Sequence, residues 1–186
     1  MRYFFGFIAF LLLIVVGTIL IVSHHHSSPK KPAPIVRTLP DYASSNSSVS
    51  MTIDGVVNGD DIHRAIRITI SKESRNIDII QGYSGNVINT SSQANTADAY
   101  SVFLRALNVA SFTAKLKKAT GPTDSAGQCP DGTREIFALS DNSNTISSLW
   151  SSSCGIGTFG GNPDLAQLLF QRQITNYEDV TANVQL

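Results

Sequence analysis

The chain has 186 residues, with fourteen basic and fourteen acidic side chains, four histidines and two cysteines. All fourteen acids lie from position 41 onward, whereas four of the basic residues precede it, so residues 41–186 carry a formal charge of −4. Nucleic acid is bound chiefly by Lys and Arg side chains that neutralise phosphates. The charge distribution therefore argues against nucleic acid as a partner.

An uncharged apolar run, from Tyr3 to Val22, lies at the N-terminus. A helix of this length spans about 30 Å, the thickness of the hydrocarbon core of a bilayer. The competing interpretation is a cleaved secretory signal, which has a shorter apolar core of about 7–15 residues and a small-residue cleavage site. The run continues instead into Ser23 and three histidines. We expect residues 1–22 to be an uncleaved, single-pass signal-anchor whose partner is the lipid bilayer.

The charges that flank the apolar run and the composition of the domain predict opposite membrane orientations. Only Arg2 and the terminal amine precede the apolar run, while Lys30, Lys31 and Arg37 follow it, so the positive-inside rule would retain the domain in the cytoplasm. Long domains, however, translocate largely regardless of charge. The two cysteines and the many Ser, Asn, Thr and Gly residues are typical of exported domains. We expect a cell-membrane protein with a cytoplasmic N-terminus and an extracytoplasmic C-terminal domain.

Residues 23–48 are predicted to be a Ser/Pro-rich stalk, because they hold four of the seven prolines and such stretches stay extended. Residues 49–186 would then form the extracytoplasmic domain. Its first strand is predicted over 49–53, where apolar and polar residues alternate. Alternating isoleucines over 62–70 predict a half-buried strand, and 75–80 completes a hairpin with it.

A helix is predicted next, with Thr96 as its N-cap and apolar residues at helical spacing from Tyr100 to Leu107. A short strand is expected over 112–116. Two further strands are expected over 134–139 and 145–150, on either side of a polar turn.

A second helix is predicted to begin at Pro163 behind an Asn162 cap, with Leu165, Leu168 and Leu169 as its buried stripe. A final strand is expected near 180–186. Because strands cluster before each helix, the predicted fold class is α+β: an N-terminal transmembrane helix plus one small domain with a mainly antiparallel sheet and two helices.

The two cysteines, Cys129 and Cys154, flank the predicted strand pair. The flanks of an antiparallel hairpin lie side by side, which is the geometry a disulfide needs. Such a bridge would stabilise the fold by about 3 kcal/mol. Free thiols in a reducing compartment are the alternative, and a zinc site is disfavoured because two cysteines without a nearby histidine do not supply four ligands.

The segment Gly155–Gly160 matches the G-x-G-x-x-G pattern of dinucleotide-binding loops. That fingerprint requires the helix to begin directly at the glycines, so that the pyrophosphate lies at its N-terminus. Here the helix is delayed to Pro163, so a tight turn is the simpler interpretation. We expect no cofactor.

His63 is the only histidine of the predicted domain, so a Ser-His-Asp triad would have to use it. No G-x-S-x-G motif supports such a triad, and the alternation of the strand places His63 opposite Ile62 and Ile66, on the solvent side.

Three further groups of histidine or acidic residues do not form a predicted site. The stalk histidines His24–His26 lack a fixed geometry for metal binding, and the pairs Asp60-Asp61 and Glu178-Asp179 are interpreted as solvated turn charges. The sequence predicts no catalytic, cofactor-binding or metal residue and favours a protein that is not an enzyme.

The single tryptophan, Trp150, has two interpretations. A core position beside the disulfide would bury its large ring, while an exposed position would offer an anchor for a sugar or a protein. Trp150 and His63 are therefore the two candidate residues for surface binding.

Several segments together resemble anchored, uncharacterised proteins of candidate-phyla-radiation bacteria of the saccharibacterial type. The similarity extends over most of the chain and is carried by the apolar helix and stalk, Gly82–Gly85, Tyr100–Leu107, Cys129–Gly132, Trp150–Cys154 and Gly157–Gly161. It implies a cell-envelope setting and no particular activity.

The apolar helix and late cysteines also resemble type IV pilins, with Gly6-Phe7 at the processing point, although Leu11 stands where the pilin helix has an acid. The first functional hypothesis is a membrane-tethered, extracytoplasmic binding or structural module that contacts an envelope protein or glycan. The alternatives are an anchored hydrolase acting on wall polymer or peptide, and a pilin-like assembly subunit.

Overall fold

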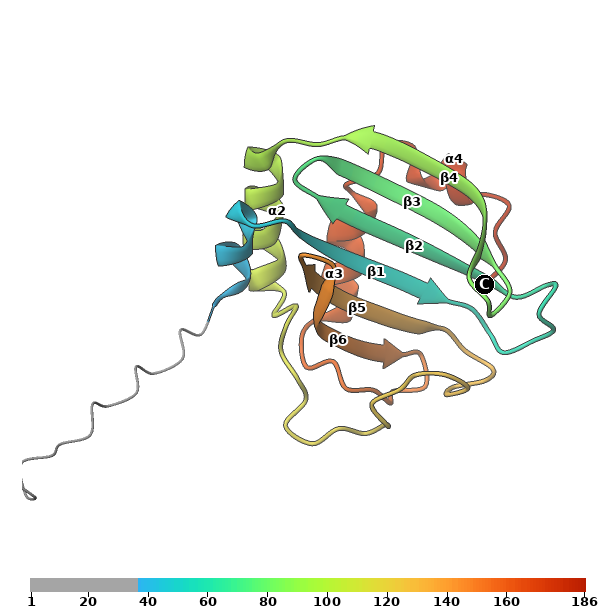
Figure 1. Ribbon diagram of the computed structural model, residues 1–186. Helices are drawn as coiled ribbons and strands as arrows, with labels where there is room; N and C mark the ends of the chain where they lie inside the picture. Colours follow the sequence, from blue (N-terminus) through green and yellow to red (C-terminus); the bar gives the residue numbers. More distant parts are fainter. Residues whose placement is uncertain (1–36) are drawn as a thin grey trace, which may run out of the picture. The chain divides into compact units, whose positions relative to one another are not determined.

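Six strands form one sheet, and the computed structural model describes residues 37–186 of the chain. Along the sheet the order is β4-β3-β2-β1-β5-β6, and all five neighbouring pairs are antiparallel (Figure 1). The strands are β1 (Ser47–Asp54), β2 (Arg64–Ser71), β3 (Ser74–Gln81), β4 (Asn86–Ala94), β5 (Arg134–Asp141) and β6 (Asn144–Ser152).

Alternation along the strands gives the sheet two different faces. In β1, Val49, Met51 and Ile53 are buried, while Ser50 and Thr52 point to the opposite side and are partly exposed. Side chains of successive strand residues point to opposite faces. One face therefore carries the apolar core beneath the helices. The other, called the open face below, is mostly polar and faces the viewer in Figure 1.

The helices pack on the apolar face. They are the 3-10 helix η1 (Leu39–Ser44) and the α-helices α2 (Ala97–Val109), α3 (Pro163–Gln171) and α4 (Tyr177–Thr181). Both predicted N-caps are confirmed: the Thr96 side chain accepts from the backbone of Ala99, and the Asn162 side chain accepts from the backbone of Leu165.

The ring of Phe103 in α2 meets Phe170 of α3 edge to face, with centroids 5.2 Å apart. Phe170 and Ala166 are the buried residues of α3, whereas Leu168 is exposed, so the predicted leucine stripe is only partly buried. The aromatic pair Phe103–Phe170 therefore joins α2 to α3, while Leu165 and Leu169 pack against the core from a partly buried position.

The predicted fold class is wrong for the described chain. Within residues 37–186 no helix is long and apolar enough to cross a membrane, and the sheet is accompanied by η1 and three α-helices instead of two helices. The transmembrane helix expected over residues 3–22 lies outside the described residues. The folded unit also begins earlier than expected, because Leu39 and Tyr42 of η1 are buried in the core.

Individual strands also differ from the prediction. The strand expected over 112–116 is irregular and makes only an isolated bridge from Lys115 to Phe159. The segment near 180–186 holds the end of α4 and a coil. Conversely, β4 was not predicted. Its side chains are almost entirely exposed and show no apolar alternation, and only its hydrogen bonds to β3 define it as a strand.

The long loop after α2 crosses the β6 edge of the sheet. Near this edge, the backbone N–H of Leu116 donates to the carbonyl of Thr158 at 2.9 Å. Farther along, the carbonyl of Pro122 accepts a hydrogen bond from Nε1 of Trp150. Trp150 is the register partner of Ile136, which is in turn the partner of Thr52, so the Trp150 side chain lies on the open face. The loop therefore covers part of the open face and forms one wall of a pocket there.

Candidate functional site

A pocket of about 340 Å³ lies at one end of the open face, between the sheet and residues 124–127 of the long loop. Its floor consists of Thr52, Ala65 and Ile80, from three neighbouring strands. The ring of Tyr83, in the turn between β3 and β4, forms another part of the lining. We call this the open-face pocket.

A charge cluster forms the end of this pocket. Asp54 of β1 and Arg134 of β5 are direct register partners, so their side chains leave the same face of the sheet side by side. Oδ2 of Asp54 accepts from Nε of Arg134 at 2.9 Å and from Nη2 at 2.6 Å, and Oδ1 lies 2.8 Å from Nε2 of His63. The Asp54 side chain is 24% exposed, against 1% for Arg134 and 2% for His63. Only the carboxylate of the cluster therefore reaches solvent.

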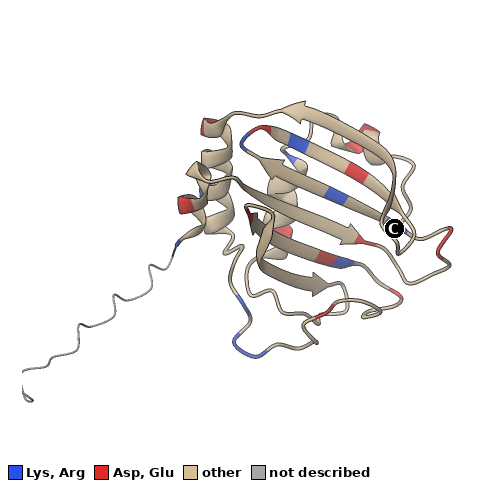
Figure 2. Cartoon of the chain, viewed as in Figure 1, with Lys and Arg blue, Asp and Glu red and all other residues tan. Residues whose placement is uncertain are grey.

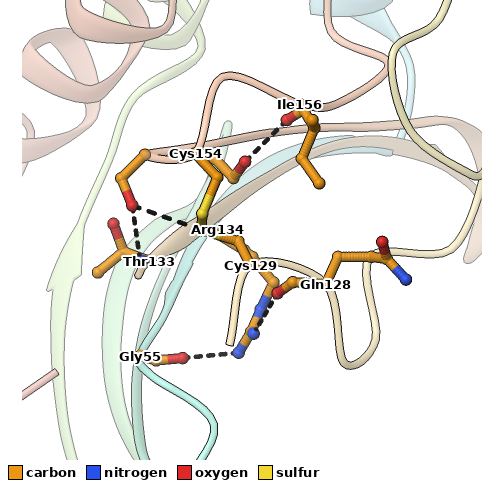
Figure 3. Close-up of a disulfide and its surroundings, with 9 residues drawn as sticks. Gly55, Gln128, Cys129, Thr133, Arg134, Cys154 and Ile156 are labelled. Carbon is orange, nitrogen blue, oxygen red and sulfur yellow. Dashed lines mark hydrogen bonds between the residues drawn. A yellow bond between two sulfur atoms is a disulfide. The ribbon is translucent and has the colours of Figure 1, made fainter. Parts of the chain in front are cut away.

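Arg134 is held on all sides by acceptors. Besides the carboxylate, its Nη1 donates to the carbonyl of Gln128 at 2.7 Å and its Nη2 donates to the carbonyl of Gly55 at 2.6 Å (Figure 3). A buried charge is tolerated only when it is paired and hydrogen-bonded. These contacts meet that requirement and tie the long loop, through Gln128, to the end of β1.

His63 lies behind the cluster, and its predicted solvent exposure is wrong. Its backbone donates to the carbonyl of Gly59 in a turn, and β2 begins only at Arg64, so strand alternation does not apply to it. Nδ1 lies 3.1 Å from the carbonyl of Val56 and Nε2 contacts Asp54. A carbonyl and a carboxylate both accept hydrogen bonds. Both ring nitrogens therefore contact protein oxygens, and neither contacts a serine hydroxyl.

Tyr83 forms the aromatic side of the pocket. Its ring stacks on His63 with centroids 4.1 Å apart, and the residue is 53% exposed. Its hydroxyl donates to the carbonyl of Asn58 and accepts from the backbone N–H of the same residue, both at 3.0 Å. The Tyr83 backbone in turn donates to Asp60 Oδ1 at 2.7 Å. Asp60, from the acidic pair Asp60-Asp61, therefore orders the Tyr83 turn.

The disulfide predicted between Cys129 and Cys154 is confirmed, with Cα atoms 5.8 Å apart. It joins the long loop to the end of β6 (Figure 3). Nearby, the Pro130 carbonyl accepts from the backbone of Val57 at 2.8 Å. The wall of the open-face pocket is therefore fastened by a covalent bond as well as by hydrogen bonds.

Trp150 is 2% exposed and therefore offers no surface anchor. Its Nε1 donates to the Pro122 carbonyl at 2.9 Å, beneath the long loop. The glycine segment 155–160 makes tight backbone contacts around the same residue: the N–H groups of Thr158 and Phe159 both donate to the Trp150 carbonyl. These glycines lie in a turn, and α3 begins only at Pro163.

The remaining predicted residues do not join the pocket. Glu178 and Asp179 lie in the first turn of α4, and His24–His26 lie outside the described residues. In the part of the chain that the structure describes, no group of three or more His, Cys, Asp or Glu side chains is arranged to hold a metal ion. Sequence reasoning missed Arg134 and Asp54. The available signal was a lone Arg and a lone Asp at the ends of strands that otherwise carry few charges.

Charges of both signs are interspersed over the strands of the open face, with no large area of one sign (Figure 2). Arg67 and Asp78, for instance, pair across β2 and β3 at 3.1 Å. In comparisons with known proteins, the chain matches no family model and no curated protein sequence.

Proposed function

We propose that the domain is a binding module that works in an oxidising, extracytoplasmic compartment and holds a ligand from the cell envelope in the open-face pocket. The observation that carries this proposal is the construction of the pocket wall. Residues 124–127 are held over the sheet by the disulfide, by the contact of Arg134 with Gln128 and by the contact of Trp150 with Pro122. A preformed concave site with a few fixed polar groups is typical of ligand binding.

The compartment is proposed from the disulfide. Such bonds persist in oxidising environments and are rare in a reducing cytosol. The test is thiol labelling of intact cells with a membrane-impermeant reagent. Labelling of Cys129 and Cys154 only after external reductant supports the proposal, and ready labelling only after lysis, without reductant, contradicts it.

Binding without catalysis is proposed from the chemistry of the pocket. His63 has both nitrogens engaged, and the Asp54 carboxylate is held by Arg134 and His63 together. A general base must be able to reach and accept the proton that it removes. The groups in the open-face pocket are instead fixed, as recognition groups need to be.

The binding test uses the full chain and envelope polymers released enzymatically from the producing cells. Ala126 lies exposed in the pocket wall, so Ala126→Trp should fill the pocket and abolish binding measured by calorimetry. The matched control is Lys117→Trp, which adds the same ring at an exposed position of the same loop, outside the pocket. Equal binding by both variants would contradict the proposed site.

A further inference from the structure

We infer that the ligand of the open-face pocket is a neutral sugar ring, bound through its C–H face on Tyr83 and through a hydroxyl that donates to Asp54. This inference deepens the proposed function and rests on it. The exposed groups of the pocket, the charges behind them and the shape of its floor all favour such a ligand.

Arg134 and His63 would attract an anion, but both are sealed from solvent and all their contacts go to protein acceptors. All three residues of the cluster line the pocket, but only the Asp54 side chain is appreciably accessible, at 24% exposure. A carboxylate can accept about four hydrogen bonds. The Asp54 carboxylate already accepts from three protein N–H groups, so it can accept from one further donor of a ligand. An anion without a donor would gain no hydrogen bond from it.

The negative charge of Asp54 is balanced by the guanidinium of Arg134, and His63 donates to the same carboxylate. The cluster therefore has no net negative charge to attract an ammonium group. Asp124, on the loop, is exposed and accepts from the backbone of Ala126 at 3.0 Å, so solvent screens its charge. A neutral donor such as a hydroxyl suits Asp54 better than a cation does.

Beside the carboxylate lie Ala65, Ile80 and Tyr83, a residue that is 53% exposed although one face of its ring stacks on His63. A pocket of about 340 Å³ is near the lower end of the range of about 300–1,000 Å³ for small-ligand sites. A pyranose ring has one C–H-rich face and hydroxyl donors at its rim. It therefore matches the apolar surface of Ala65 and Ile80 beside the accepting oxygens of Asp54, either as a free sugar or as the end unit of a polymer.

The test uses the full, oxidised chain and three probes that share one ring: methyl glucoside, methyl glucosaminide and methyl glucuronide, which are neutral, cationic and anionic. Binding is measured by NMR titration. We expect the neutral glycoside to bind at least as tightly as the amine and at least about tenfold more tightly than the glucuronide. The oxygens of Asp54 accept but do not donate hydrogen bonds, so a glucuronide carboxylate beside them would lose its hydrogen bonds to water without replacement.

The variants test the stacking. Tyr83→Ala should weaken binding of the neutral glycoside by about five- to tenfold, and Tyr83→Phe, which retains the ring, by less than about twofold. The control is Val87→Ala, which removes an exposed apolar side chain next to the Tyr83 turn but outside the pocket. Should Tyr83→Ala fail to fold, the ranking of the three probes decides.

The outcomes separate the two proposals. Tighter binding of the amine or the glucuronide, or binding unaffected by Tyr83→Ala, overturns the sugar inference. If released envelope polymers bind in a manner that Ala126→Trp abolishes while none of the three glycosides binds, the sugar inference fails and the proposed function stands. If neither polymers nor glycosides bind, both fail.

Discussion

Loss of the Arg134 side chain tests whether the charge cluster holds the pocket together. Arg134→Met retains much of the buried alkyl length but leaves the carbonyls of Gly55 and Gln128 without their donor and Asp54 without its main partner. Breaking a buried ion pair by removing one member costs about 3–5 kcal/mol. Because Asp54 remains partly exposed and bonded to His63, we expect the lower end, about 3 kcal/mol.

The reciprocal change should cost more. Asp54→Asn leaves the guanidinium of Arg134 fully buried without a counter-charge, so we expect a loss of about 4–5 kcal/mol. The matched control is Arg67→Met, which removes a more exposed pair with Asp78 and should cost less than about 1 kcal/mol. Urea unfolding followed by circular dichroism measures all three variants at one pH and temperature.

Two results would refute this reasoning. A loss below about 1 kcal/mol for Arg134→Met would mean that the buried pair contributes no more than an exposed one. A larger loss of unfolding free energy for Arg134→Met than for Asp54→Asn would mean that the size of the loss does not depend on how deeply the remaining charge is buried.

Three other predictions follow from single contacts. Reduction of the disulfide, or replacement of Cys129 and Cys154 by serine, should lower the free energy of unfolding by about 3.5 kcal/mol for a loop of 25 residues, and no change in urea midpoint would contradict this. Trp150→Phe should cost about 1–2 kcal/mol through the lost bond to the long loop, and accelerated hydrogen exchange in residues 119–127 would report the loosened wall. Burial, the largest cause, raises the pKa of Glu135, although the hydroxyl of Ser151 donates to it and opposes the shift. The folded state then retains this proton more tightly, so stability falls as pH rises above the ordinary value of 4.5. Glu135→Gln should consequently be more stable than the parent at pH 8, with a difference that disappears below pH 4.5, and a pH-independent difference would exclude this origin.

The local pattern was sufficient for elements whose residues repeat with the period of their own backbone. The isoleucines of β2 and the caps Thr96 and Asn162 predicted their strand and helices correctly. It failed where no such period exists. Strand β4 has mostly exposed, uncharged side chains, and its backbone is a strand only because β3 supplies the hydrogen bonds. Predicted strands near 112–116 and 180–186 had the composition of a strand but no neighbour in the sheet.

By itself, the sequence determined the two helices with caps, the hairpin strands and the cysteine pair, because each depends on residues close together in the chain or on one hairpin. Only the tertiary structure decided the site. Asp54 and Arg134 are 80 positions apart and meet because β1, which pairs with β2 on one side, pairs on its other side with β5, a strand distant in the chain. His63 became a buried partner of Asp54 because a turn, and not strand alternation, directs its side chain. The pocket depends on long-range register and loop packing, which leave no periodic signal along the chain.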